Sequence, residues 1–485
     1  MKRAAITYCF ILMLCGLNFT TAQTNDSLPA SSTDSVLYLS LDSCRAMTLR
    51  NNIDIRIAQK NIEKAEAEKS AALSNYFPKI SANAGAMYMF KDMQFIKNLE
   101  EYIPPFSIDD GSFSPEMGTD IEKLLNMLRS ELIIRVWEPI TVSLKGAFLA
   151  NITLQQPIFA GGRIVSGNKM AKIGVEMAQE NNRLQKSNAI VEADKMYWLY
   201  ISVKEKVKLA ETYSGLLDNL VKMVSDAATT DMISNNDLMK VKVQRDKVKM
   251  ELQKARSGLE LTRMALCKTL GVSYDTQIVP TDTVVQTNEH FALTPPNALE
   301  RRPEYQLMQK MIAIKEGEIK LVRGNYLPTI GMAASYAYVG GVKVQGKNTH
   351  PQNLSNVMAT ISIPITNWWE GSQKIKSARV DKNIAELEVE KNLKLIELEI
   401  KQAELNMTDA FTRINMCDEA LEQTKENLRI MTDRYELDLE TLPALLEAQA
   451  QWQNAYSELI DARIDFRIKE TEYLKAIGEL TGYPQ

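Results

Sequence analysis

The apolar residues in the last quarter of the chain have the spacing of packed helices. Between residues 393 and 421 they alternate steps of three and four residues: Leu393, Ile396, Ile400, Ala403, Met407, Ala410, Ile414, Cys417 and Leu421. A seven-residue repeat sustained over this length is typical of helices packed side by side. The same steps return from Ala448 to Phe466, so this region predicts two long antiparallel helices.

The first half predicts a similar pair, from about Gly162 to Val224 and from about Ser234 to Leu270. Asp231 and Asp438 lie where each pair reverses and a left-handed backbone is expected, which Asp tolerates better than most side chains. Ser234 and Thr441 follow three residues later, and their hydroxyls can accept hydrogen bonds from the first N–H groups of the returning helix. We therefore expect helical hairpins with tips near residues 231 and 438.

Between the helical regions the period of the pattern changes to two. Four segments alternate apolar with small or polar residues, around residues 80–90, 148–154, 330–338 and 357–363. Strands of about ten residues with one apolar face are typical of a membrane-spanning β-barrel. Two half-buried hairpins of a soluble domain would show the same alternation, and the strands alone leave that alternative open.

Four strands cannot close a barrel, and an open sheet edge does not survive in lipid. The barrel would therefore be shared between identical chains in a symmetric ring. The first hairpin is the longer one, because Pro78 to Pro157 spans 79 residues and Pro328 to Pro364 spans 36. We expect the long loop 91–145 to face the outside and to cover the mouth.

The two halves also share landmarks at fixed spacing. Ser-Asn-Tyr-Phe-Pro (74–78) recurs as Gly-Asn-Tyr-Leu-Pro (324–328), and 74 residues separate Pro157 from Asp231 and Pro364 from Asp438. A duplication that keeps its lengths predicts arms whose reach matters. We predict a signal peptide at 1–22, a flexible segment at 23–38, a first repeat at 39–271, a linker at 272–296 and a second repeat at 297–485. Each repeat would hold a helix, a β-hairpin (79–157 or 329–365) and a helical hairpin.

The N-terminus predicts export. Lys2 and Arg3 precede an apolar run that ends in small residues up to Ala22, which is typical of a secretory signal. A lipid-attachment signal ending at Cys15 is the alternative, but Leu14 stands where such signals place a small residue. No later run of about 18 apolar residues is present, so strands would have to make any membrane crossing.

Charge and reactive residues exclude several functions. The formal charge of −4 becomes −6 without Lys2 and Arg3, which argues against a nucleic-acid partner. Beyond the predicted signal peptide, three scattered cysteines (Cys44, Cys267 and Cys417) and two histidines argue against a disulfide scaffold and a metal cluster. The heptad position of Cys417 favours a buried apolar role over a reactive thiol. No phosphate-binding loop is present, so we expect no cofactor and no enzyme.

Together these landmarks resemble the TolC-like outer-membrane efflux protein family over the whole mature chain. The matching motifs are Asn75 to Pro78, Gln156 to Gly162, Ala444 to Gln449, and Leu474 with Ile477 and Gly478. The resemblance implies a mixed α and β membrane protein that is internally duplicated. Four strands per chain would enter a shared, trimeric, twelve-stranded barrel in the outer membrane, and coiled-coil hairpins would form a periplasmic α-barrel.

The resemblance also implies roles for residues at the tips. Asp237, Glu447, Tyr435 and Glu440 would surround a periplasmic aperture, with Tyr435 tying neighbouring hairpins together. A periplasmic adaptor would dock on the tip residues Asp231, Met232, Ser234, Asp438, Leu439 and Thr441. The aspartates at 231 and 438 replace family glycines, Glu440 replaces a basic residue and Ala444 an acid, so the latch contacts of relatives do not transfer directly. A solvated helix face is the alternative for each acid.

The sequence thus predicts a passive exit duct of a tripartite efflux or secretion system, a homotrimer that receives its substrates from an adaptor and an inner-membrane pump. One alternative is a periplasmic coiled-coil spacer without a channel, which would not need the period-two segments. The other is an envelope hydrolase, for which no nucleophile and base stand out.

Overall fold

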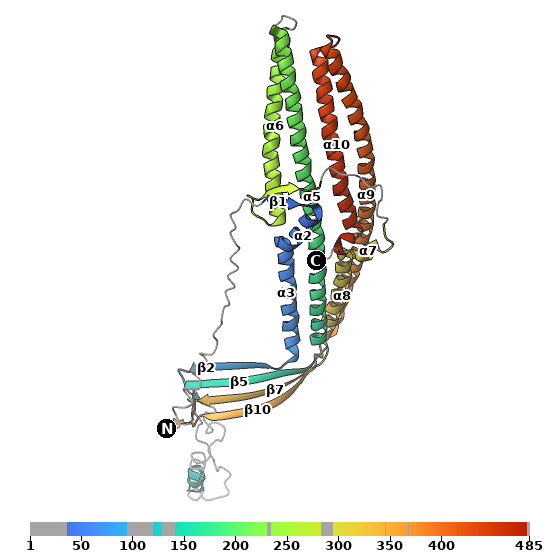
Figure 1. Ribbon diagram of the computed structural model, residues 1–485. Coiled ribbons are helices and arrows are strands. Elements are labelled where there is room, and N and C mark those ends of the chain that lie inside the picture. The colour runs from blue at the N-terminus through green and yellow to red at the C-terminus, as the bar shows by residue number, and fades with distance from the viewer. Residues whose placement is uncertain are drawn as a thin grey trace.

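The computed structural model describes residues 36–94, 120–128, 141–229, 234–282, 294–344, 346–366 and 368–482. The predicted signal peptide (1–22), most of the loop 91–145, and the tip residues Asp231 and Met232 lie outside these ranges. Long helices run side by side, and a four-stranded sheet extends from one end of them (Figure 1). Among the described helices, none is long and apolar enough to cross a membrane.

The two halves of the chain have the same order of elements. The first half contains α2 (Leu41–Asn51), α3 (Ile53–Leu73), β2 (Lys79–Tyr88), β5 (Lys145–Ala160), α5 (Arg163–Thr229) and α6 (Asn235–Leu270). The second half contains α7 (Ala298–Arg301), α8 (Pro303–Gly324), β7 (Thr329–Gly340), β10 (Gln352–Ser362), α9 (Trp368–Glu436) and α10 (Leu442–Ala476). The predicted long helices are confirmed, and α5 and α9 are single helices of 67 and 69 residues. At 1.5 Å per residue each reaches roughly 100 Å.

The strands form one antiparallel sheet in the order β10-β7-β5-β2. Its pairing aligns a row of apolar residues on one face: Ile80, Leu154, Ala334 and Val357. The next row, on the other face, is polar: Ser81, Thr153, Ser335 and Asn356. The predicted alternation is therefore confirmed in these two rows.

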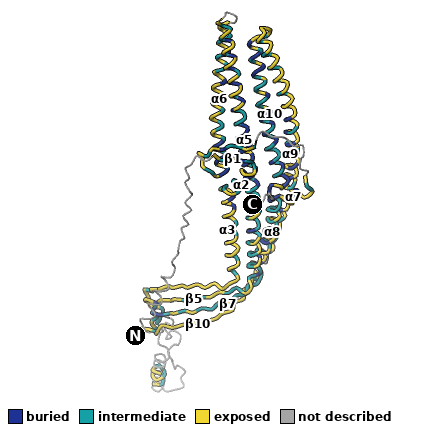
Figure 2. The backbone as a smooth tube through the Cα atoms, viewed as in Figure 1, coloured by how far each residue is buried: buried dark blue, intermediate teal, exposed yellow. Residues whose placement is uncertain are grey.

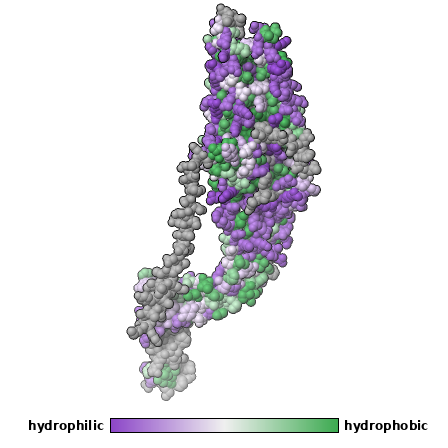
Figure 3. All heavy atoms as spheres, in the orientation of Figure 1, coloured by the Kyte–Doolittle hydropathy of each residue, from purple (hydrophilic) through white to green (hydrophobic). Residues whose placement is uncertain are grey.

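The apolar face of this sheet is exposed in the single chain. The exposed fractions of Ile80 and Val357 are 71% and 73%. The strands are largely yellow in Figure 2, whereas the buried residues follow the helices. Green residues gather along the sheet in Figure 3, while purple residues dominate the helices just above it.

The duplication extends to individual contacts. Residues of the second half lie 207 positions after their counterparts from β5 onward, and 250 positions after them in α2, α3 and β2. Arg256 on α6 bonds Glu211 on α5 at 2.8 Å, and the counterpart Arg463 on α10 bonds Asp418 on α9 at 3.1 Å. The same cross-hairpin ion pair is thus present in both copies.

Two predicted irregular segments are partly strands. β1 (Val36–Leu39) pairs in parallel with β6 (Gln277–Pro280), so residues 36–38 of the predicted flexible segment and 277–280 of the predicted linker are ordered. Four-residue strands are too short to show a period, and their partners lie far apart in sequence. Their pairing places Leu39 and Ile278 in a core cluster with Tyr197 and Leu266.

The hairpin loops also contain short elements. β3 (Met93–Gln94), β4 (Thr141–Ser143), β8 (Lys343–Val344) and β9 (Lys347–Asn348) form a second small sheet, and residues 120–128 are helical. The part of 91–145 that is described is therefore not a plain loop, and the connection between β7 and β10 contains β8 and β9. The boundaries of the two repeats themselves stay a proposal.

Candidate aperture and docking tips

The tip of the second helical hairpin is a tight turn around Asp438. The N–H of Leu439 donates to the carbonyl of Arg434 at 2.9 Å, and the N–H of Asp438 donates to that of Tyr435 at 3.1 Å. This pair of bonds is typical of a helix C-terminus that ends in a left-handed residue, which here would be Asp438. Asp438 has φ of 58°, the only non-glycine residue of the described chain with a positive φ. The predicted left-handed turn at Asp438 is confirmed.

The two predicted caps differ. The side chain of Ser234 accepts from the N–H of Asn236, so this cap is confirmed. Thr441 makes no such bond, and its predicted cap is wrong. Pro443 occupies the second position of α10 and has no N–H to donate, which removes one of the groups a cap would satisfy. The backbone carbonyl of Thr441 instead accepts from Leu445.

The remaining residues of this tip present one acid and two apolar side chains. Glu440 is half-buried and lies 3.8 Å from Arg434 across the turn. Leu437 and Leu439 project into solvent, with exposed fractions of 69% and 68%. Apolar side chains this exposed at a helix turn contribute little to their own chain and are available to a partner.

Asp237 acts electrostatically on Tyr435 although the two residues lie on different hairpins. Burial raises the pKa of the Tyr435 phenol, and the nearby carboxylates of Asp237 and Asp438 raise it further. The Tyr435 hydroxyl is buried without a hydrogen-bond partner among the described residues. Tyr435 also packs against the cluster that joins α5, α6 and α10 near the tips, with Leu217, Val241 and Leu445.

Asp237 and Glu447, two of the three predicted aperture acids, have different surroundings. Asp237 is ion-paired with Lys240 at 2.9 Å, a partner one helical turn away that its i, i+3 spacing could have indicated. Glu447 is exposed and accepts only a hydrogen bond, from Gln451 at 3.2 Å. Within the described residues no ion pair joins Glu447 to a base. Glu447 is therefore the less compensated of the two charges.

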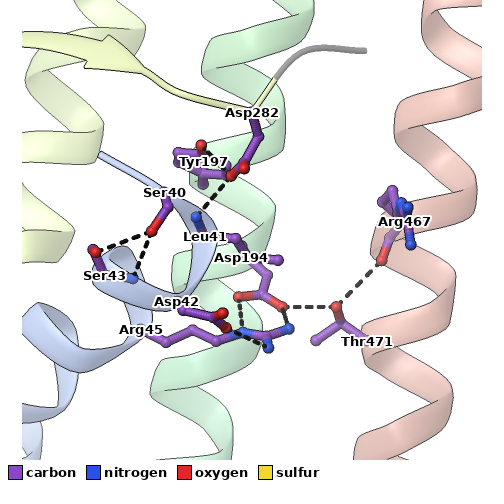
Figure 4. Close-up of polar contacts among 10 residues, drawn as sticks. All are labelled: Ser40, Leu41, Asp42, Ser43, Arg45, Asp194, Tyr197, Asp282, Arg467 and Thr471. Carbon is purple, nitrogen blue, oxygen red and sulfur yellow. Dashed lines mark hydrogen bonds and ion pairs between the residues drawn. The ribbon is translucent and has the colours of Figure 1, made fainter. Parts of the chain in front are cut away.

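A buried polar network at mid-height was missed from the sequence. Arg45 on α2 binds Asp194 on α5, whose carboxylate also accepts from the hydroxyl of Thr471 on α10 at 2.8 Å (Figure 4). Asp194 is fully buried. It falls between Ala193 and Tyr197 of an apolar stripe, and an acid within such a stripe was the available signal.

A second, separate set of polar contacts lies nearby and holds the ordered N-terminal segment. The Tyr197 hydroxyl donates to Asp282 at 2.6 Å, and the N–H of Leu41 donates to the same carboxylate at 2.8 Å (Figure 4). The start of α2 and the segment after β6 are thus tied to α5 through Tyr197, while the bond from Thr471 to Asp194 ties α5 to the second hairpin. The helical hairpins continue past these contacts to their tips.

Comparison with known proteins agrees with this geometry. Residues 294–479 match the family model described as outer membrane efflux protein. Among curated protein sequences none matches significantly. Solved structures with the same fold include the three described next. CusC, described as forming a transmembrane channel, superposes with a TM-score of 0.69 at 13% identity, over 93% of this chain and 95% of its own.

The other two are described as outer membrane proteins. The CmeC outer membrane channel of Campylobacter jejuni gives a TM-score of 0.67 at 15% identity, over 90% of this chain and 85% of its own. VceC of Vibrio cholerae gives 0.66 at 13% identity, over 90% and 96%. The predicted mixed α and β fold and the resemblance to TolC-like efflux proteins are confirmed, and the family's description agrees with the predicted outer-membrane location.

Proposed function

We propose that this chain, which resembles the outer membrane efflux proteins in fold throughout and in sequence over residues 294–479, is one third of a passive exit duct. Three chains would close a twelve-stranded barrel in the outer membrane and continue it as a helical tunnel in the periplasm. A periplasmic adaptor and an inner-membrane pump would deliver the substrate to the tips. The duct itself would do no chemistry.

The observation that carries the proposal is a sheet with an apolar face and two open edges. Among the described residues β2 and β10 each pair on one side only, and both are membrane-length strands of ten and eleven residues. In hydrocarbon every backbone N–H and C=O must be paired, so these edges require further strands. Identical chains supply them in a ring, because the two edges belong to opposite ends of one sheet.

The helices give an independent argument for the same ring. Above mid-height they lie in the order α6-α5-α10-α9, so that α6 and α9 form the two flanks (Figure 1). Each flank carries a second apolar stripe, on the face opposite to its packed one. On α6 this stripe is Met239, Val243, Met250, Leu261 and Met264; on α9 it is Val380, Ile384, Leu387, Leu395, Leu398, Leu405 and Met416. A helix that is apolar on two sides is typically packed on both.

The flanks are also complementary in charge. α6 contains nine basic and four acidic side chains, whereas α9 contains eleven basic and fifteen acidic ones. A head-to-tail ring would bring α6 of one chain against α9 of the next, which joins opposite net charges. The periplasmic tunnel would therefore close between α6 and α9 of neighbouring chains, and the barrel would close between β2 and β10 of the same neighbours.

Docking of the adaptor is assigned to the tips. The exposed side chains of Leu437 and Leu439 support this assignment, and Met232 occupies the matching place in the first tip. Replacing Met232 and Leu439 by Glu should abolish export while leaving the trimer intact. Export that survives in this variant would place the adaptor on the helix flanks instead.

The proposal is tested by mass and conductance together. Mass photometry in mild detergent should give a trimer, and the purified trimer should conduct in planar bilayers. Cells that lack the protein should accumulate a substrate of the inner-membrane pump that works with it, and complementation should restore export. A purified protein that is monomeric, or a trimer that does not conduct, would favour a periplasmic spacer.

A further inference from the structure

The duplication fixes how the ring closes, down to the pairing of single residues. Within the chain the two β-hairpins have one register. Lys79 pairs with Gln155 and its counterpart Thr329 pairs with Ser362; at the other end Met87 pairs with Ala147 and Ala337 pairs with Leu354. The 250- and 207-residue offsets carry each pair of the first hairpin onto a pair of the second, from one end of the ladder to the other.

The hairpins are joined to each other by β5 and β7. In this junction Ile152 pairs with Tyr336, and Pro157 pairs with Gly331. β10 is the counterpart of β5, and β2 is the counterpart of β7. We propose that β10 of one chain pairs with β2 of the next in the register of this internal junction. The inference rests on the proposed function, because it requires a closed ring.

The offsets then name the partners at the seam. Ala359, the counterpart of Ile152, lies opposite Ala86, the counterpart of Tyr336, in the next chain. Pro364 lies opposite Ser81 in the same way. The barrel becomes a ring of six equivalent hairpins, of which three junctions lie within chains and three lie between them.

The length of β10 supports this register. β5 runs from Lys145 to Ala160, and the counterpart of its first residue is Gln352, where β10 begins. β10 ends at Ser362, however, five residues before the counterpart of Ala160. The segment of β5 after Gln155 has no partner on β2 and is paired only with β7. In β5 the corresponding residues are thus held by β7 alone. The counterpart of β7 at the seam is β2 of the next chain. β10 therefore ends at the point where β2 of the next chain would continue the ladder.

Charge at the junction gives a second, independent argument. Arg163 begins α5 and Thr329 begins β7, and both line a hollow of about 780 Å³ where the sheet meets the helices. Their counterparts across the seam are Glu370 on α9 and Lys79 on β2. Both are exposed in the single chain, and neither has an ion-pair partner among the described residues. The seam brings these opposite charges to one place.

Disulfide trapping tests the register. Directly opposed residues of an antiparallel ladder have Cα atoms about 4.5–5.5 Å apart, which a disulfide spans. Ala86→Cys with Ala359→Cys should give covalently linked trimers under mild oxidation. The control Ala82→Cys with Ala359→Cys uses the same face four residues out of register, roughly 14 Å along the strand. The control pair should lose nearly all of the linked product, because Cα atoms more than about 7 Å apart cannot be bridged without backbone movement. Cys44, Cys267 and Cys417 are buried and do not compete.

Charge reversal tests the ion pair. Lys79→Glu or Glu370→Lys alone should shift the trimer dissociation equilibrium by about 1.4- to 5-fold per pair, and the double reversal should restore it. Mass photometry of every variant separates the two proposals. A trimer that links through Ala82 and not Ala86 overturns the register while the duct proposal stands, whereas loss of the trimer in the parent protein overturns both.

Discussion

Asp438 shows how one backbone angle determines the end of a long helix. The equivalent turns after α6 and α10 use Gly271 and Gly478, with φ of 67° and 79°. Asp438 adopts the same left-handed region with a Cβ, and it places a negative charge at the negative end of the α9 dipole. Asp438→Gly should therefore stabilise the protein by about 1 kcal/mol, and Asp438→Asn by less, because Asn removes only the charge. Thermal unfolding followed by circular dichroism measures both.

The reverse change is the control. Gly271→Asp should lower the melting temperature, because a Cβ there would lie 2.8 Å from the Cβ of Asn51. If Asp438→Gly and Gly271→Asp changed the melting temperature in the same direction, the left-handed backbone angle would not limit the stability of either turn.

The buried ion pair of Arg45 and Asp194 makes the second prediction. Arg45→Met leaves a fully buried carboxylate with only Thr471 as a partner, which should cost about 3–5 kcal/mol of unfolding free energy. Arg45→Met with Asp194→Leu should recover much of that loss, since no charge is then left buried. Reversing the exposed pair Lys60 and Glu63 on α3 should change stability by less than about 1 kcal/mol. A loss in Arg45→Met as small as that of the exposed pair would contradict the assignment.

The helices and strands of the chain differed in how well the sequence predicted them. Long periodic stretches identified α5, α6, α9 and α10 and all four barrel-type strands, because many residues repeat one spacing. β1 and β6 were missed because each has four residues and its partner lies about 240 positions away. The predicted cap at Thr441 was wrong because Pro443 has no N–H group to donate. The role of Asp194 was missed because its partner Arg45 lies on α2, far away in the sequence.

The aperture prediction belongs to the paired helices at the tips. Asp237 is compensated by Lys240 in the same helix, whereas Glu447 lacks a basic partner in the described chain. In a threefold ring three copies of Glu447 would therefore supply most of the negative potential. Glu447→Gln should remove most of the cation preference in planar-bilayer recordings, and Asp237→Asn should remove much less. Equal effects of the two, or no effect of either, would place the constriction elsewhere.

The proposed assembly depends on features that no single chain satisfies. The apolar sheet face, the open edges of β2 and β10, and the second stripes of α6 and α9 are all exposed in one copy. Sequence periodicity predicted the strands and therefore the need for a ring. It did not reveal the flanks, because the buried and exposed stripes of a helix have the same spacing and only the packing order distinguishes them.

The flank prediction tests the helical half of the ring separately from the barrel. Met250 lies in the second apolar stripe of α6 with an exposed fraction of 62%. Met223 is an exposed methionine on α5, which is not a flank helix. Met250→Asp should place a charge in the seam and face the acidic α9 of the next chain, so the trimer should dissociate at protein concentrations where the parent does not. Met223→Asp introduces the same group on the same hairpin away from the flank and should leave the trimer intact. Dissociation of both variants in mass photometry would indicate general destabilisation, and dissociation of neither would show that α6 does not lie in the seam.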